Sequence, residues 1–309
     1  MARIVFLGTG DIALPTFRWL LVSSTPPIAL VTQPDRPAGR HRELKAPAIK
    51  LLAEDAGVAV LQPEKVRDPA ALEALEALQP DLIVVMAYGQ ILPQRLLDMA
   101  PLGCVNLHAS LLPKYRGAAC IQAALDAGDA ETGMTLMHVI RQLDAGDVIL
   151  SKRIPIGARD TGGSLHDRLA EAGVEALAEG LPLLLDGSAP RTPQDELGES
   201  SHIPKLGRDD GRIDWSWPAA RIERRLRAYD PWPGCSTSFN GRRLKIFPFA
   251  EVIEGEGNPG EVREIDGRVA VACGDGALTL DEVQPDGSRR MSALDWWRGQ
   301  RLDVATFDS

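Results

Sequence analysis

An amide and an imidazole stand two residues apart in the segment Asn106-Leu107-His108. Side chains of a β-strand alternate between its two faces, so Asn106 and His108 share one face if this segment is a strand. Both side chains can then donate hydrogen bonds to a carbonyl oxygen that becomes an oxyanion during acyl transfer. A polar strand end that faces water would use the same residue types. Spacing alone leaves both interpretations open.

A carboxylate follows later in the chain, in Leu143-Asp144-Ala145-Gly146-Asp147. A strand predicted over residues 134–140 ends just before this segment, so Asp144 is expected at the same edge of a sheet as His108. A carboxylate beside a histidine raises the pKa of the imidazole and fixes its orientation. An aspartate that only caps its own loop is the alternative interpretation.

A glycine-rich turn opens the chain. Gly8-Thr9-Gly10-Asp11-Ile12-Ala13 matches the loose dinucleotide-binding fingerprint between a predicted strand and a predicted helix. An NAD-binding domain would also place an acidic residue at the end of its second strand. Here that strand ends in Thr32-Gln33-Pro34, and Asp35 falls in a proline-flanked loop. The pattern therefore favours a tight strand–helix turn, and an NAD-dependent oxidoreductase stays a remote alternative.

The elements that must position these residues follow from apolar periodicity. Short apolar runs predict strands at 4–7, 28–32, 58–61, 81–86, 104–108 and 134–140, and amphipathic patterns predict helices at 12–21, 48–56, 70–78, 118–127 and 165–185. Apolar runs without alternation, separated by helices, indicate a mostly parallel sheet covered on both faces. We therefore predict a doubly wound, Rossmann-like α/β domain over residues 1–189, with ligands at the carboxyl ends of its strands.

The sequence pattern changes after this domain. Residues 190–206 are polar and proline-punctuated, which predicts an inter-domain linker. Beyond them, four short β-type runs separated by glycines predict a small OB-like β-barrel over residues 207–309. These runs are 236–239, 244–249, 268–272 and 277–280.

Composition limits the class of protein. The chain has 309 residues, 44% of them hydrophobic and 25% charged, as in globular proteins of two domains. It has neither a membrane-length apolar run nor a secretory signal, so we expect a cytosolic protein. The four cysteines (Cys104, Cys120, Cys235 and Cys273) and the five histidines show no metal-ligand spacing, so we expect reduced thiols and no metal.

Net charge is −9, which argues against a general nucleic-acid binder. One segment differs from the rest. Residues 221–245 hold seven basic groups against two acidic ones. A local patch of this kind could meet a polyanion that the whole surface would repel.

Several segments together carry a family resemblance. Residues 106–117, Asn-Leu-His-Ala-Ser-Leu-Leu-Pro-Lys-Tyr-Arg-Gly, resemble the signature of formyltransferases that use 10-formyltetrahydrofolate, and residues 143–147 resemble their aspartate loop. Further similar segments lie at 32–40, 85–93, 128–133, 213–215 and 231–233. Over nearly the whole chain they resemble the methionyl-tRNA formyltransferases. The resemblance implies formyl transfer from 10-formyltetrahydrofolate to the amino group of methionyl-initiator tRNA, without a metal.

The resemblance also implies roles for single residues. Asn106 and His108 would bind the formyl oxygen, while Asp144 would keep His108 charged and help to collect the proton of the amine. The folate pocket would be lined by Met86, Tyr88, Gly89, Ile91, Leu92, Ser110, Leu111, Leu112 and Pro113.

Basic residues would meet the tRNA. The family carries an insertion at 33–45 that enters the acceptor end of tRNA, although the composition alone suggests a solvated loop. The candidates are Arg36, Arg40, Arg42 and Lys45 in this loop, and Arg224, Arg225, Arg227, Arg242, Arg243 and Lys245 in the C-terminal region. A solvated amphipathic helix is the alternative for residues 221–227.

Two positions depart from the family pattern: Gly10 and Cys120 stand where proline is usual, and neither is expected to touch the chemistry. Relatives that formylate an amino sugar nucleotide or hydrolyse formyltetrahydrofolate share the Asn-x-His and Asp elements. The basic loop and the C-terminal region favour tRNA over these alternatives. A non-catalytic RNA-binding module would explain the basic patch only. We expect a monomer that needs no membrane.

Overall fold

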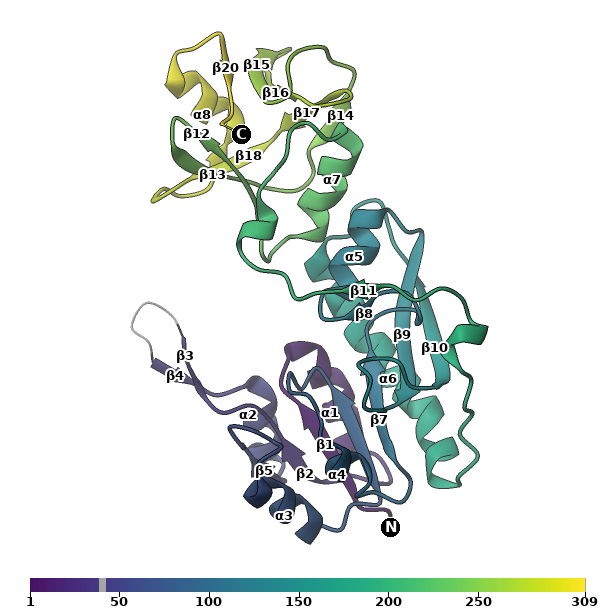
Figure 1. Cartoon of the computed structure of the whole chain (residues 1–309). Helices are drawn as coiled ribbons and strands as arrows, with labels where there is room; N and C mark the ends of the chain where they lie inside the picture. The colour runs from purple at the N-terminus through teal and green to yellow at the C-terminus, as the bar shows by residue number, and fades with distance from the viewer. Residues whose placement is uncertain (39–42, 309) are drawn as a thin grey trace. The chain divides into compact units, whose positions relative to one another are not determined.

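The computed structural model describes residues 1–38 and 43–308 (Figure 1). The chain forms two compact units. The first contains Met1–Cys120, Glu131–Ile154 and His166–Ile203, and the second contains Ile121–Ala130, Pro155–Leu165 and Pro204–Ser309. Most of the predicted linker therefore belongs to the first unit, and two short segments of the predicted catalytic domain belong to the second.

A seven-stranded sheet forms the centre of the first unit. Its order is β10-β9-β7-β6-β1-β2-β5. The strands are β1 (Ile4–Gly8), β2 (Pro27–Val31), β5 (Ala59–Leu61), β6 (Leu82–Met86), β7 (Cys104–His108), β9 (Glu131–His138) and β10 (Val148–Pro155). The strands from β5 to β7 pair in parallel, and β9 pairs antiparallel to β7. This confirms the predicted mostly parallel sheet. The chain winds outward in both directions from β1 and β6, so a ligand crevice is expected where these strands end.

Helices cover both faces of this sheet. On one face, the side chains of Val5, Leu7 and Ile83 form one core cluster with α3 (Pro69–Ala77) and α4 (Gln94–Leu97). On the other face, the ring of Phe6 lies 5.1 Å from that of Phe17 in α1 (Leu14–Leu21). Gly173 of α6 (Gly162–Leu185) lies close to this face, because a Cβ there would stand 3.0 Å from Met86 Cε. Helix α2 (Ala48–Asp55) follows the 33–45 segment.

That segment is more regular than the predicted solvated loop. β3 (Arg36–Ala38) and β4 (Glu43–Lys45) pair antiparallel and project from the unit (Figure 1). At its base, Lys50 Nζ lies 2.8 Å from Asp35 Oδ2, and the Gln62 amide donates to Asp35 Oδ1 at 2.7 Å. A polar cluster therefore holds the hairpin where it leaves the sheet.

Two antiparallel sheets form the second unit. One has the order β12-β13-β18-β19 and the other β14-β17-β16-β15-β20. The bounds are β12 (Cys235–Phe239), β13 (Arg242–Ile246), β14 (Glu251–Ile253), β15 (Glu261–Ile265), β16 (Arg268–Ala272), β17 (Ala277–Leu280), β18 (Glu282–Pro285), β19 (Met291–Ser292) and β20 (Val304–Thr306). A bridge between Ser238 and Asp308 joins the β12 edge to the chain just after β20. The predicted small domain of short strands is confirmed.

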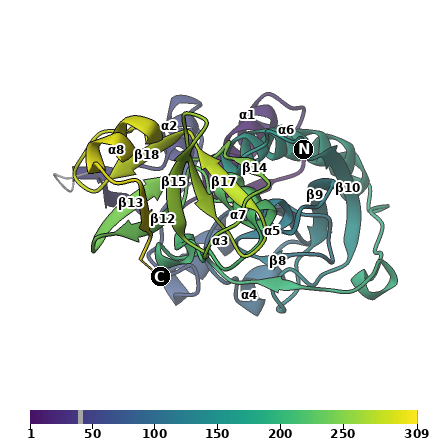
Figure 2. The same ribbon diagram turned by 90° about the horizontal axis from the view of Figure 1, so that it is seen from above.

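Aromatic rings fill the centre of this unit. The rings of Trp215, Phe239 and Trp296 each lie 5.5–6.1 Å from that of Phe307. Trp296 belongs to α8 (Ala293–Gln300). Helix α7 (Ala219–Ala228) packs next to β14 and β17 (Figure 2). Ile222 and Leu226 of this helix are buried, and Arg227 is buried with them, whereas Arg221 is exposed.

A short parallel pair ties the connecting segment to the first unit. β8 (Arg116–Gly117) pairs with β11 (His202–Ile203), and a 3-10 turn, η2 (Gln194–Glu196), lies between α6 and β11. Among the residues that the structure describes, no helix has the length and apolarity needed to cross a membrane. Those same residues hold no group of three or more His, Cys, Asp or Glu arranged for a metal ion.

Candidate active site

His108 ends β7, and its side chain is buried, with 7% of its surface exposed. Its Nε2 lies 3.0 Å from the Tyr115 carbonyl, so this nitrogen donates to the backbone and fixes the ring plane. Nδ1 lies 3.7 Å from Asp144 Oδ2, an ion-pair distance without a direct hydrogen bond. The structure thus brings together the histidine and the aspartate that the sequence placed at one sheet edge. Nδ1 is the nitrogen left for chemistry.

The surroundings of His108 favour its charged form. Burial lowers the pKa of His108, but Cys120, the Asp144 carboxylate and the Tyr115 carbonyl together raise it more, to about 9. At neutral pH the ring is therefore an imidazolium, and Nδ1–H is a hydrogen-bond donor. Cys120 was expected to lie away from the chemistry. Instead it lies near enough to His108 to be one of the groups that raise the pKa of the imidazole.

Asn106 lies on the same strand, in register with Val85 of β6 and Met137 of β9. Its side chain is half-buried. Within residues 1–38 and 43–308, the Asn106 amide has no hydrogen-bond partner. Its N–H groups can therefore donate to a ligand oxygen without breaking a bond within the protein.

The Asp144 loop is held in an unusual backbone conformation. Asp144 has φ +48, in the left-handed region, and its carboxylate accepts the Gly117 N–H at 2.9 Å. Tyr115, on the other side of His108, has φ +60. Left-handed conformations at non-glycine residues are strained and occur often at functional sites. Gly146 completes the turn, since a Cβ there would lie 1.8 Å from the His138 carbonyl oxygen.

The proposed folate-pocket residues divide into two groups. Met86, Tyr88, Ser110 and Leu112 are at most 5% exposed, so their side chains belong to the core. Pro113 is buried too. Leu111 and Leu92 are half-buried, Gly89 is exposed, and Ile91 is 84% exposed. The latter four are the ones that can touch a ligand. Their contact with folate stays a prediction.

The basic residues of the hairpin are only partly described. Arg36 is exposed and lies 3.2 Å from Glu64, and Lys45 is exposed as well. Arg40 and Arg42 lie outside the described residues.

Two of the arginines that are predicted to contact tRNA form ion pairs within the second unit. Arg225 forms a two-bond ion pair with Asp126 and stacks on Trp217. Arg227 is 8% exposed and bonds to Glu223 and to the Asp160 carbonyl. Both guanidinium groups are thus engaged within the second unit, and their contact with tRNA stays a prediction.

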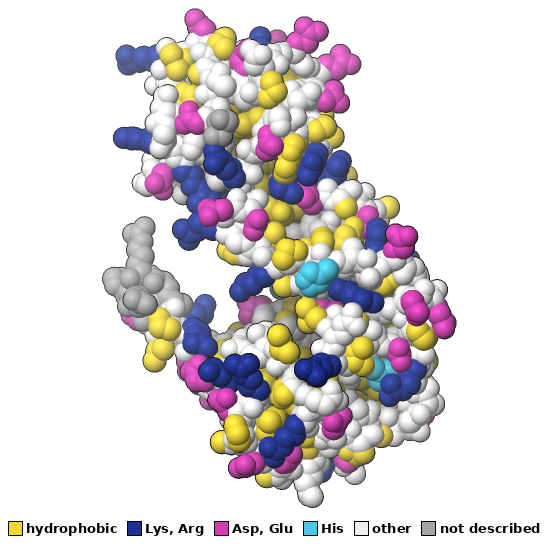
Figure 3. All heavy atoms as spheres, in the orientation of Figure 1, with side chains coloured by type: hydrophobic (Ala, Val, Ile, Leu, Met, Phe, Trp, Pro, Cys, Tyr) yellow, Lys and Arg dark blue, Asp and Glu magenta, His cyan; other side chains and the backbone are white. Residues whose placement is uncertain are grey.

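The other four candidate basic residues of this unit are at least partly open to solvent, although Arg224 Nε also donates to the Asp126 carbonyl at 3.1 Å. Arg242 and Arg243 are exposed, and Arg224 and Lys245 are half-buried. Dark blue Lys and Arg side chains gather over the part of the unit that carries α7, β12 and β13 (Figure 3). These four side chains remain candidates for phosphate contacts.

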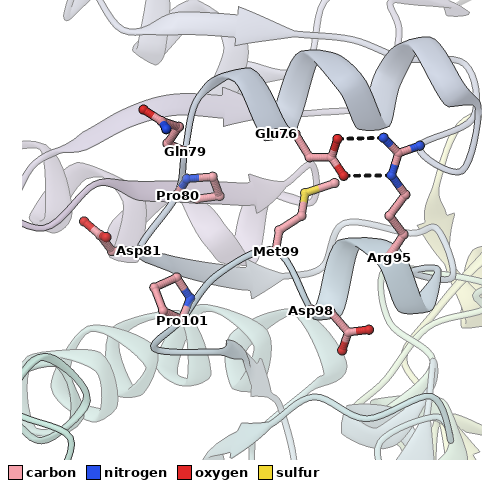
Figure 4. Close-up of a pocket in the computed structure, with 8 residues that line it drawn as sticks. All are labelled: Glu76, Gln79, Pro80, Asp81, Arg95, Asp98, Met99 and Pro101. Carbon is pink, nitrogen blue, oxygen red and sulfur yellow. Dashed lines mark hydrogen bonds and ion pairs between the residues drawn. The ribbon is translucent and has the colours of Figure 1, made fainter.

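A separate pocket of about 620 Å³ lies at the amino ends of β6 and β7. Figure 4 shows the Arg95 guanidinium in a two-bond ion pair with Glu76, beside Met99. Asp81 accepts the backbone N–H of Arg3 at 2.7 Å. The pocket lies at the opposite end of the strands from His108. It is not part of the cluster around His108 and Asp144.

Sequence reasoning missed the groups that hold the candidate catalytic residues. These groups surround His108 and Asp144. The Tyr115 carbonyl accepts a hydrogen bond from His108, Ser201 in turn accepts the Tyr115 N–H, and Cys120 contributes to the raised pKa of His108. Gln194 donates to the Asp144 carbonyl. Gln194 is 50 residues from Asp144 in the sequence, and no spacing rule links the two. Only the Cys120 departure from the family pattern offered a signal.

Comparison with known proteins shows the family. The formyl transferase family model matches residues 2–181, and that for its C-terminal domain matches residues 205–301. A methionyl-tRNA formyltransferase from Akkermansia muciniphila is 52% identical over 94% of both chains. One from Pseudomonas entomophila is 47% identical over 98% of this chain and 97% of its own.

Solved structures share the fold. The N-formyltransferase from Helicobacter canadensis, crystallised with folinic acid and dTDP-3-aminofucose, has a TM-score of 0.66 at 15% identity and covers 94% of this chain and all of its own. Sequence identity is thus far higher to the enzymes named for methionyl-tRNA than to this structural relative. The chain belongs to the methionyl-tRNA formyltransferase family.

Proposed function

We infer that this protein transfers the formyl group of 10-formyltetrahydrofolate to the amino group of methionyl-initiator tRNA, for use in translation initiation. The observation that carries this is the His108 cluster at the carboxyl end of the sheet, in a chain 52% identical to a methionyl-tRNA formyltransferase. 10-Formyltetrahydrofolate and the charged tRNA are the two substrates. The residues around His108 would supply hydrogen bonds and charge to the reacting groups.

Two donors are available for the formyl oxygen. The Asn106 amide has no competing partner among the described residues, and Nδ1–H of the His108 imidazolium is left free by the bond of Nε2 to Tyr115. Negative charge develops on the formyl oxygen as the amine attacks the formyl carbon. Donors aimed at that oxygen stabilise the transition state more than the ground state. We propose that Asn106 and His108 supply them.

Asp144 completes the site. Its carboxylate stabilises the positive charge of His108, and as an anionic group beside the ring it can accept the proton that the attacking amine loses. When the bond between the formyl carbon and the folate nitrogen breaks, that nitrogen takes up a proton. The proton count is then balanced without a metal or a covalent enzyme intermediate.

The remaining proposals concern the residues that contact the two substrates, the oligomeric state and the location in the cell. We propose that Leu92, Leu111 and Ile91 contact the folate and that the 33–45 hairpin contacts the tRNA acceptor end. We further propose that the enzyme works as a monomer in the cytosol. Sedimentation of the purified chain tests the monomer. A dimer at micromolar concentration would contradict it.

The decisive assay measures formyl transfer from 10-formyltetrahydrofolate to charged initiator tRNA. Charged elongator methionine tRNA is the control substrate, and His108→Ala is the control variant. Formylation of the initiator alone, lost in the variant, is the expected result. Consumption of the folate without formylated tRNA would instead point to the hydrolase or amino-sugar alternatives.

A further inference from the structure

The segment between α6 and the second unit runs across the catalytic loops of the first unit. We call residues 190–203 the strap. An antiparallel bridge between Thr192 and Val148 fixes its start, and the parallel pairing of β11 with β8 fixes its end. Both attachment points lie in the sequence next to catalytic segments. The strap is therefore an ordered part of the site-bearing unit, where the sequence predicted a linker.

Gln194 is the most buried polar group of the strap, with 4% of its surface exposed. Its amide nitrogen donates to the carbonyls of Asp144 and Gly146, at 2.9 and 2.8 Å. Its amide oxygen accepts the Arg116 Nε–H at 3.0 Å. Both amide hydrogens and the oxygen are thus used. The side chain joins the Asp144 loop to the signature segment.

Ser201 bonds to Tyr115, the residue whose carbonyl orients His108. Its hydroxyl accepts the Tyr115 N–H at 2.8 Å, and its backbone carbonyl accepts the Arg116 N–H at 2.8 Å. The Tyr115 carbonyl in turn accepts Nε2 of His108. The strap therefore grips both the carboxylate loop and the carbonyl that orients the imidazole.

We propose that Gln194 is a positioning residue for formyl transfer, which holds the Asp144 carboxylate at its working distance from His108. The left-handed conformation of Asp144 needs such a restraint, because an isolated loop would relax toward a less strained conformation. This inference rests on the proposed roles of Asp144 and His108. Displacing a catalytic group by about 1 Å can cost about 100-fold in rate.

Gln194→Ala and Gln194→Glu form the first pair of variants. Glutamate keeps the volume of glutamine and an oxygen for Arg116, but it has no N–H for the two carbonyls. If donation positions the loop, both variants lower kcat by about 10- to 100-fold, with KM for either substrate changed less than about 3-fold. If Gln194 only fills space, Gln194→Glu keeps the activity of the unaltered protein, and the proposal is overturned.

A double-mutant cycle with Asp144→Ala gives the second readout, in single-turnover assays with excess enzyme. Groups that act through one another are not additive. Gln194→Ala should therefore change the rate less than about 2-fold once Asp144 is already alanine. If Gln194→Ala lowers the rate by the same factor in the unaltered protein and in Asp144→Ala, its effect is independent of Asp144 and the inference is refuted.

Failure of the inference and failure of the proposed site give different results. If Asp144→Ala alone keeps full turnover, the catalytic assignment itself is wrong. If Asp144→Ala is inactive but Gln194→Glu is fully active, only the role of the strap is wrong. Should Gln194→Ala fail to fold, Gln194→Glu carries the same test. Gln300→Ala is the matched control, because that amide donates to the Trp296 carbonyl within α8, and its kcat should be unchanged.

Discussion

At the residue scale, the charge of His108 links the site to the stability of the fold. The pKa of His108 rises from 6.5 to about 9 in the folded chain. Protonated His108 therefore stabilises the fold fully below about pH 6.5, and this contribution is lost as the pH rises through 9. We expect the free energy of unfolding to fall by about 2 kcal/mol between about pH 6.5 and 8.5 relative to His108→Gln.

Urea unfolding of both proteins at the two pH values measures this difference. The range stops below pH 9 because burial raises the pKa of the thiols of Cys104, Cys235 and Cys273, which destabilises the fold only at higher pH. Identical pH slopes for the two proteins would mean that His108 is not charged in the folded state.

Asn106 provides a second test at this scale. Asn106→Ala removes a donor to the formyl oxygen, which should lower kcat by about 100- to 1000-fold. Asn106→Asp keeps the shape but turns a carboxylate toward the developing negative charge, so it should be at least as inactive. Because the Asn106 side chain makes no hydrogen bond to the described part of the chain, the melting temperature of both variants should change little. Near-normal turnover of Asn106→Ala would remove Asn106 from the mechanism.

At the element scale, the strap approaches the β8 strand too closely for any side chain. A Cβ on Gly117 would lie 2.2 Å from the Ile203 carbonyl oxygen, and Gly117 has φ +107. Gly117→Ala should push the strap away from β8 and lower kcat by at least about 10-fold, since Gly117 N–H also holds Asp144. Gly103→Ala is the matched control: its φ is +96, but nothing lies within 4 Å of the added Cβ.

Both glycine variants should lose about 1 kcal/mol or more of stability from the left-handed backbone. Only Gly117→Ala should also lose turnover when assayed well below its melting temperature. Equal turnover in the two variants would mean that the contact between β8 and the strap does not matter for catalysis. A thermal scan and a steady-state assay of each variant suffice.

The elements also show how far sequence reasoning reaches. Apolar runs predicted the strands that carry Asn106, His108 and Met86, because a buried parallel strand needs such a run whatever surrounds it. The strap was predicted as a linker, because its polar residues and prolines resemble solvated chain. Its order comes from Gln194 and Ser201 bonding to backbone groups far away in the sequence, and such bonds leave no local pattern.

Similar reasoning explains the arginines of α7. The sequence predicted tRNA contacts from this helix, with a solvated amphipathic helix as the alternative, and its Arg221 is exposed. Arg225 and Arg227 are exceptions because Asp126 and the Asp160 carbonyl come from distant segments that fold against α7. Which of several arginines bonds internally is decided by tertiary contacts.

At the scale of the whole molecule, a chain of net charge −9 must bind a polyanion through local patches. Arg242 and Arg243 are exposed on β13. Each phosphate contact that is lost lowers the magnitude of the slope of log association constant against log salt concentration by about 1. The double variant Arg242→Ala/Arg243→Ala should therefore bind initiator tRNA more weakly, with a slope reduced by about 2.

Arg227→Ala is the contrasting variant. It leaves Glu223 without its ion-pair partner, so it should lower the melting temperature and keep the salt slope. Filter binding at four salt concentrations separates the two effects, and an unchanged slope in the double variant would mean that this face does not meet phosphates.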